Sequence, residues 1–482
     1  MTSGPTAATE GTGIEPGSPP GANLIISLLV GSAFVMILNE TIMSVALPVL
    51  IVDLHVTAAT AQWLTSGFLL TMAVVIPMTG SLLQRFPARG VYLAAMVLFC
   101  TGTLLAALAP GFPMLLVARI VQACGTAVMV PLLMTTIMNL VPVQRRGQTM
   151  GTISIVIAVA PAVGPTLSGL ILGSLGWRWM FWVVLPIALI ALAAGIGWLR
   201  VPDERRRATP IDPVSVPLSG LAFAGLVLGL SLLGGARAHG GLPAWVPLSV
   251  GAVAMVLFGF RQVWLQRRDR AFLDLRPFTH RRFTVSLALV VLGFMALFGA
   301  IIMLPLYVQD VLKQSALVAG LVGLPGGLLM GAAGPFVGRA YDRHGARSLV
   351  IPGAVLLCAA LWGYATLAAT SPIWELVLLQ MVMMLGLSMM FTPLMTDALG
   401  VLPEWLYSHG SAILTTLQQV AGAAGTALFI TVMTNASQSD GAPDLPGVRA
   451  AFTVAAVIGV VVVIASFFTG RRPAPADGLP TS

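Results

Sequence analysis

Apolar residues in this chain form long runs that short polar segments separate. A helix needs roughly 20 mostly apolar residues to cross the hydrocarbon core of a bilayer, because it rises about 1.5 Å per residue. Fourteen runs reach that length, and each of them predicts a membrane-spanning helix. Their ranges are 24–49, 61–83, 90–109, 113–140, 148–174, 178–199, 214–235, 243–265, 283–308, 317–338, 347–369, 373–399, 409–435 and 448–469.

A short signature after the second run recurs 258 residues later. Pro77, Gly80, Arg85, Ala88 and Arg89 recur at the same spacing as Pro335, Gly338, Arg343, Ala346 and Arg347. Parallel repeats of this kind are typical of membrane transporters. The repeat predicts two six-helix bundles with two additional helices between them, which is an all-α integral membrane fold.

This organisation divides the chain into five parts. Residues 1–22 are rich in Pro, Gly, Ser and Thr and predict a disordered tail. Residues 23–200 form the first six-helix half, 201–270 hold the two inserted helices with their linkers, and 271–470 form the second half. Residues 471–482 predict a second disordered tail.

The composition favours a membrane protein, since 57% of the residues are hydrophobic and only 9% are charged. A soluble domain carries roughly 25% charged residues. If the N-terminus is cytoplasmic, twenty of the 25 basic residues lie in inner loops or the C-terminal tail. This asymmetry predicts that both termini are cytoplasmic, and the net charge of +8 then reflects topology, not nucleic-acid binding. Arginine greatly outnumbers lysine, which is typical of GC-rich bacterial genomes, so we expect a bacterial inner (cell) membrane.

No motif in the sequence indicates an enzyme. The chain contains no GxxxxGK[ST], HExxH or CxxC string, and its three cysteines all fall inside apolar runs. Its five histidines lie near the predicted span ends and do not suggest a metal site. We therefore expect no enzyme activity, no metal and no cofactor.

A few polar side chains fall inside the predicted spans. Glu40 lies midway along the first span, and an intramembrane carboxylate usually faces a cavity or a partner because exposure to lipid is costly. Arg119 shares one face of the fourth span with Gln122 and Thr126. Glu40 is the candidate partner of Arg119, either for proton coupling or as a purely structural pair. Asp397, at the inner end of the span 373–399, is either a second titrating group or a solvated residue at interface depth.

Polar stripes suggest a substrate cavity. The span 409–435 places Gln418 and Gln419 on one face, which suits either a cavity wall or interhelical hydrogen bonding. The span 373–399 holds several methionines, which suit either an adaptable cavity or apolar packing. The candidate substrate-binding residues are Asn39, Met43, Gln122, Thr126, Gln418 and Gln419.

Several strings together resemble the major facilitator superfamily, and within it the fourteen-helix drug:proton antiporters of the lincomycin-resistance type. They are LNETIMSVALP (from Leu38), RIVQACGTA (from Arg119), APAVGPTLSG (from Ala160), GWRWMFW (from Gly176) and GRAYDRHGAR (from Gly338). The resemblance implies conformational roles for Gly80, Arg85, Arg89, Gly164, Pro165, Gly169, Gly338, Asp342, Arg343 and Arg347.

Two departures from the family pattern matter. In the first copy of the repeated signature, Gln84 and Pro87 replace the usual Asp and Gly. In the first span, Asn39 occupies the usual acidic position and the carboxylate moves to Glu40. One residue is about 100° around a helix, so the side of the helix that Glu40 takes is left open.

The resemblance implies a proton-coupled antiporter that exports small amphipathic drugs or antibiotics by alternating access, driven by the proton motive force. Its partners would be protons, the small amphipathic substrate and membrane lipid, and we expect a monomer. The alternatives are a metabolite facilitator or importer of the same fold, and a non-transporting membrane sensor.

Overall fold

The computed structural model describes residues 21–199, 212–233, 243–268, 270–438 and 444–470. Every regular element in these ranges is helical, which confirms the all-α prediction. The two predicted tails lie almost entirely outside the described residues, as do the arginines between positions 200 and 211.

Fourteen long helices in the described part correspond in order to the fourteen predicted spans. They are α1 (Ala22–Asp53), α2 (Ala58–Val75), α4 (Ala88–Ala107), α5 (Phe112–Leu140), α7 (Ile153–Ser174), α8 (Arg178–Trp198), α9 (Ser215–Leu233), α10 (Trp245–Gln266), α11 (Arg281–Leu306), α12 (Ala316–His344), α13 (Arg347–Ala365), α14 (Ile373–Gly400), α15 (Tyr407–Ala436) and α16 (Leu445–Ser466). At thirteen of these fourteen places the helical segment has the length and hydropathy of a membrane span. The exception is α7. The chain is therefore a multi-pass membrane protein.

Three predicted spans differ in detail from the helices. The second is interrupted by a 3-10 turn at Ile76–Met78 and continues as α3 (Thr79–Arg85), since Pro77 cannot donate a backbone hydrogen bond. The fifth begins later than predicted, because the short α6 (Arg146–Met150) precedes α7. The ninth continues beyond α11 as a π-helical turn, Tyr307–Val311.

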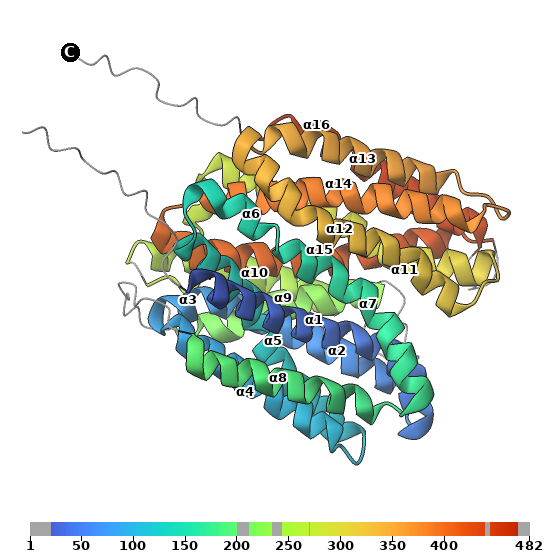
Figure 1. Cartoon of the computed structure of the whole chain (residues 1–482), viewed down its shortest axis with the longest axis horizontal. Helices are drawn as coiled ribbons and strands as arrows, with labels where there is room; N and C mark the ends of the chain where they lie inside the picture. The colour runs from blue at the N-terminus through green and yellow to red at the C-terminus, as the bar shows by residue number, and fades with distance from the viewer. Residues whose placement is uncertain (1–20, 200–211, 234–242, 269, 439–443, 471–482) are drawn as a thin grey trace, which may run out of the picture.

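The helices run roughly side by side through the molecule (Figure 1). In this view α4 and α8 lie at one edge, α13 and α16 lie at the other edge, and α7, α12 and α15 lie between them. The start of α1 and the end of α16 lie at the same end of the bundle. We call this end the terminal face and the other end the opposite face.

The inserted helices α9 and α10 pack on each other, and α9 contacts α2 and α15. Just before α9, the carboxylate of Asp212 accepts hydrogen bonds from Nε and Nη2 of Arg261 at 2.7 and 2.8 Å. These bonds, together with bonds from Ser215, lower the pKa of Asp212 from its ordinary value of 3.8 to about 2. The two inserted helices are thus joined by a charged contact near one end.

The segment after α10 links the inserted pair to the second half. Oε1 of Gln262 accepts hydrogen bonds from the backbone N–H groups of Phe272 and Leu273 at 2.9 and 3.0 Å. The backbone N–H of Asp274 donates to Nδ1 of His409 on α15 at 3.3 Å. The inserted helices are therefore tied by hydrogen bonds to the start of α15.

Hydrogen bonds that join the two halves gather toward the terminal face. Asp342 of α12 accepts bonds from two backbone N–H groups of α6. Arg146 donates to the hydroxyl of Tyr407 at 3.1 Å, and Thr135 donates to Ser411 at 3.2 Å. The halves are closed against each other at this face.

Candidate functional site

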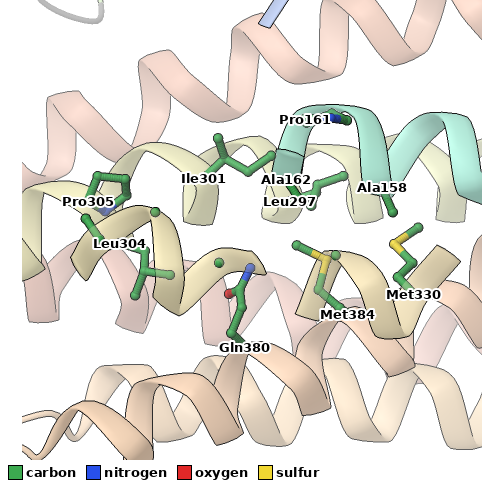
Figure 2. A pocket seen from close by; sticks show the side chains of 14 residues that line it. Ala158, Pro161, Ala162, Leu297, Ile301, Leu304, Pro305, Met330, Gln380 and Met384 are labelled. Atoms are coloured by element: carbon green, nitrogen blue, oxygen red, sulfur yellow. The ribbon is translucent and has the colours of Figure 1, made fainter. Parts of the chain in front are cut away.

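Two small adjoining chambers lie between the halves. The first has a volume of about 180 Å³ and is lined by α1, α2, α5, α7, α11 and α15. The second has a volume of about 130 Å³ and is lined by α7, α11, α12 and α14 (Figure 2). Pro161, Leu297 and Ile301 line both chambers. We call them the Glu40 chamber and the Gln380 chamber.

Glu40 lies on the wall of the first chamber, at the middle of α1. It is the one ionisable side chain among the described residues that line either chamber. The other lining groups are apolar, or are the neutral hydroxyl and amide groups of Thr41, Thr126, Thr415 and three glutamines. The question that the sequence left open is thus answered, because Glu40 faces the space between the halves.

Arg119 lies inside the first half, and only 1% of its surface is exposed. Its Nη1 donates to Oδ1 of Asn39 at 3.1 Å and to Oε1 of Gln122 at 3.0 Å. Nε2 of Gln122 in turn donates to Thr103 of α4 at 2.8 Å. The guanidinium also lies 4.2 Å from the ring centre of Phe68 on α2. Arg119 therefore ties α1, α2, α4 and α5 together.

The predicted pairing of Arg119 with Glu40 is wrong as a direct contact. Arg119 bonds to Asn39, and no ion pair between Arg119 and Glu40 is present among the described residues. The reason is rotation about the helix, since consecutive residues on α1 point about 100° apart. Asn39 turns into the first half and Glu40 turns to the chamber. Glu40 is still near enough to Arg119 for their opposite charges to attract.

The predicted substrate-binding residues divide into two groups. Thr126, Gln418 and Gln419 line the Glu40 chamber. Nε2 of Gln418 is buried without a hydrogen-bond partner in the described part, and Nε2 of Gln419 lies 3.9 Å from the sulfur of Met72. The remaining three candidates do not line either chamber.

Asn39 and Gln122 belong to the Arg119 network, so they support the chamber wall from behind. Met43 is 1% exposed and packs in an apolar cluster with Leu64, Leu115 and Phe181. It follows Asn39 by four residues and therefore shares the inward face of α1, not the face of Glu40. The expectation that Met43 binds substrate is not supported by this position.

Sequence reasoning missed the aromatic wall that α11 contributes. Phe294 and Phe298 line the Glu40 chamber, with their ring centres 6.1 Å apart, and Phe294 also stacks on Phe391 at 4.7 Å. Their spacing of four residues is the available signal. Because nearly every position in 283–308 is apolar, the pattern does not distinguish a cavity face from a packing face.

Among the residues with predicted conformational roles, those of the second signature copy make the closest contacts between the halves. Oδ1 and Oδ2 of Asp342 accept from the backbone N–H groups of Gly147 and Gln148 at 2.8 and 2.9 Å. Gly338 lies directly against the backbone of Gly147. Arg343 is exposed at the end of α12, and Arg347 begins α13.

In the first signature copy, Gly80 packs against His409 of the second half. Arg85 ends α3, where its guanidinium lies 5.7 Å from the ring centre of Phe86. Arg89 donates to the backbone carbonyl of Ile196 at 2.5 Å, a contact within the first half. These arginines therefore do not join the halves through those contacts.

On α7, Gly164 packs closely against a neighbouring helix, whereas Gly169 does not. A methyl group placed on Gly164 would collide with the side chain of Thr41 on α1. A methyl group on Gly169 would meet nothing within 4 Å, because this residue is exposed. The side chain of Pro165 lies outside the described residues.

Asp397 lies in a separate cavity of about 410 Å³ at the terminal face, which Arg146, Arg282 and Asp342 also line. Its carboxylate accepts a hydrogen bond from Ser286 at 3.3 Å. The structure therefore does not bring Asp397 together with Glu40.

Comparisons with known proteins match this architecture. The model of the Major Facilitator Superfamily matches residues 29–426. The lincomycin resistance protein LmrB of Bacillus subtilis is 38% identical over 93% of this chain and 95% of its own length. LmrB of Listeria monocytogenes is 40% identical over 94% of this chain and 93% of its own length. A multidrug resistance protein B homolog of Mycobacterium tuberculosis is 31% identical, covering 82% of this chain and 73% of that protein.

A solved structure has the same fold. The human organic anion transporter MFSD10 (TETRAN) superposes with a TM-score of 0.65, covering 93% of this chain and 100% of that chain. The sequences are 17% identical, so this likeness concerns the fold alone.

Proposed function

This chain belongs to the Major Facilitator Superfamily, and we propose that it exports small amphipathic drugs or antibiotics in exchange for protons. Its relatives are named for lincomycin resistance and multidrug resistance, which supports this class of substrate. The terminal face is then the cytoplasmic face of a bacterial inner membrane. The proton motive force supplies the energy, and the chain works as a monomer without a cofactor.

The position of Glu40 is the main support for proton coupling. A carboxylate in a chamber whose described wall residues include no cationic side chain is costly when it is charged and unpaired. A bound proton removes that cost, and a cationic group of a substrate offsets it. Because one carboxylate cannot hold both, proton and substrate weaken each other's binding, which is the condition for exchange.

Alternating access supplies the other requirement. The halves are closed at the terminal face through the contacts of Asp342, Arg146 and Gly338. Opening of this face exposes the Glu40 chamber to the cytoplasm, where the proton leaves and the substrate binds. Closure of the same face and opening of the opposite face release the substrate and reload the proton.

The test is proton movement in proteoliposomes that carry an imposed proton gradient and an internal pH dye. Addition of lincomycin or a lipophilic cationic dye should release protons through the wild type. Glu40→Gln should abolish this exchange while the protein stays folded, and Glu40→Asp should retain part of it as the matched control. Full exchange in Glu40→Gln would exclude Glu40 as the coupling group.

Flux of the compounds without proton movement in the wild type would indicate a facilitator. A ligand-dependent conformational change without flux would indicate a sensor.

A further inference from the structure

The Gln380 chamber has a single polar side chain on its wall. Of the fourteen residues that line it, Gln380 alone carries an N–H or O–H group in its side chain (Figure 2). The rest of the wall is made of aliphatic side chains, glycines, prolines and the thioethers of Met330 and Met384. Gln380 itself is only 3% exposed. A buried amide in such a chamber needs partners for its hydrogen-bonding atoms.

One end of this amide is already fixed by the protein. The hydroxyl of Tyr364 on α13 donates to Oε1 of Gln380 at 2.7 Å. Tyr364 is fully buried, and its ring stacks on Phe452 of α16 with centres 4.8 Å apart. Because the hydroxyl occupies Oε1, the amide cannot rotate freely, and its NH₂ group has a defined direction.

The stem of Gln380 is held as well. A methyl group placed on Gly326 of α12 would lie 2.9 Å from Cγ of Gln380, so the two helices are in close contact there. Figure 2 shows the side chain of Gln380 rising from α14 with its nitrogen toward the chamber. No described residue accepts a hydrogen bond from Nε2. The NH₂ group is therefore a positioned donor that the described residues leave unused.

We propose that Gln380 is the hydrogen-bond donor that selects exported compounds with a carbonyl, ether or hydroxyl oxygen, and that Tyr364 is its positioning residue. This inference depends on the proposed export function and deepens it by naming a recognition group. An N–H group left without a partner in an apolar chamber costs free energy, and a substrate oxygen removes that cost. A compound without such an oxygen leaves the donor unpaired and binds less tightly.

The size of the chambers indicates how one compound uses both. Pockets for drug-sized ligands have volumes of roughly 300 Å³ or more. The chambers have about 130 and 180 Å³ and share three wall residues, so one compound of that size must occupy both. An acceptor oxygen then lies at Gln380, apolar groups lie against Met330 and Met384, and a cationic group lies toward Glu40.

The test compares two triphenylphosphonium cations that differ in one group: a chain that carries a ketone, and the same chain with a methylene in its place. Binding to the purified full-length protein is measured in detergent by fluorescence quenching. The wild type should bind the ketone roughly tenfold more tightly than the methylene compound, as expected for one buried hydrogen bond. Gln380→Met has a similar volume and no donor, and it should bind both compounds equally.

Tyr364→Phe separates positioning from direct contact. It should lower the ketone preference by a few fold and leave the affinity for the methylene compound unchanged, since the NH₂ group is present but no longer directed. Leu378→Met, on the exposed face of the same helix, is the matched control and should keep the full preference. Thermal unfolding of each variant confirms that the fold is intact.

Equal binding of the two compounds by the wild type, or a preference that persists in Gln380→Met, would overturn this inference. Because the binding assay needs no proton gradient, its result is independent of the proposed antiport. Proton exchange that depends on Glu40, found together with no ketone preference, would leave the proposed function standing and exclude only the role of Gln380.

Discussion

The two copies of the repeated signature lie at the same face but join the halves in different ways. In the first copy, Nε2 of Gln84 donates one hydrogen bond to the backbone carbonyl of Trp405 at 2.8 Å. In the second copy, the two carboxylate oxygens of Asp342 accept from two backbone N–H groups at 2.8 and 2.9 Å. Hydrogen bonds to a charged group are roughly twice as strong as neutral ones. The second copy therefore holds the terminal face more firmly.

The glycines of the two copies also differ, because Gly338 packs more tightly against the other half than Gly80 does. A methyl group on Gly80 would lie 2.7 Å from Nδ1 of His409, which is a side-chain atom. A methyl group on Gly338 would lie 2.7 Å from the backbone Cα of Gln148 and would collide with the backbone of Gly147. A side chain can move aside more easily than a helix backbone. The comparison indicates that two copies of one sequence repeat can contribute unequally to closing the terminal face.

The largest effect is expected from Gly338→Ala. Its methyl group cannot fit against Gly147 and Gln148, so the terminal face should not close and transport should fall to background. Closure is measured with a cysteine at Val130 in the Glu40 chamber, in a background without the native cysteines. A membrane-impermeant maleimide added to inside-out vesicles should label it faster in this variant. Gly169→Ala, which meets nothing within 4 Å, is the control, and an equal labelling rate in both would contradict the packing argument.

A smaller effect is expected from Asp342→Asn, which keeps the shape but loses the charge and one acceptor oxygen. The loss of a charge-assisted hydrogen bond costs about 2 kcal/mol, which shifts the closed-to-open ratio roughly 30-fold. The same labelling assay should report this shift as a higher rate. An unchanged rate would mean that packing at Gly338 closes the face without help from the carboxylate.

The smallest effect is expected from Gln84→Ala, which removes one neutral hydrogen bond to Trp405. Such a bond contributes about 1 kcal/mol, so the ratio should change roughly fivefold. Paired measurement with Asp342→Asn sharpens the comparison between the copies. A larger shift for Gln84→Ala than for Asp342→Asn would reverse the proposed order.

Much of the fold could be read from the sequence. The positions of the fourteen long helices follow from apolar runs, because the length needed to cross a bilayer is a local property. The shared face of Arg119 and Gln122 also followed from their spacing, and the two side chains are hydrogen-bonded. The break at Ile76–Met78 was not predicted, since proline inside a membrane helix is often tolerated.

The sequence by itself therefore determined which residues form helices and which of them share a helix face. Only the tertiary structure decided what each face meets: that Asn39 and not Glu40 bonds Arg119, that Phe294 lines a chamber, and that Tyr364 holds Gln380. The physical reason is that helical periodicity is set within one segment. The rotation of a helix about its axis, by contrast, is set by the packing of all its neighbours.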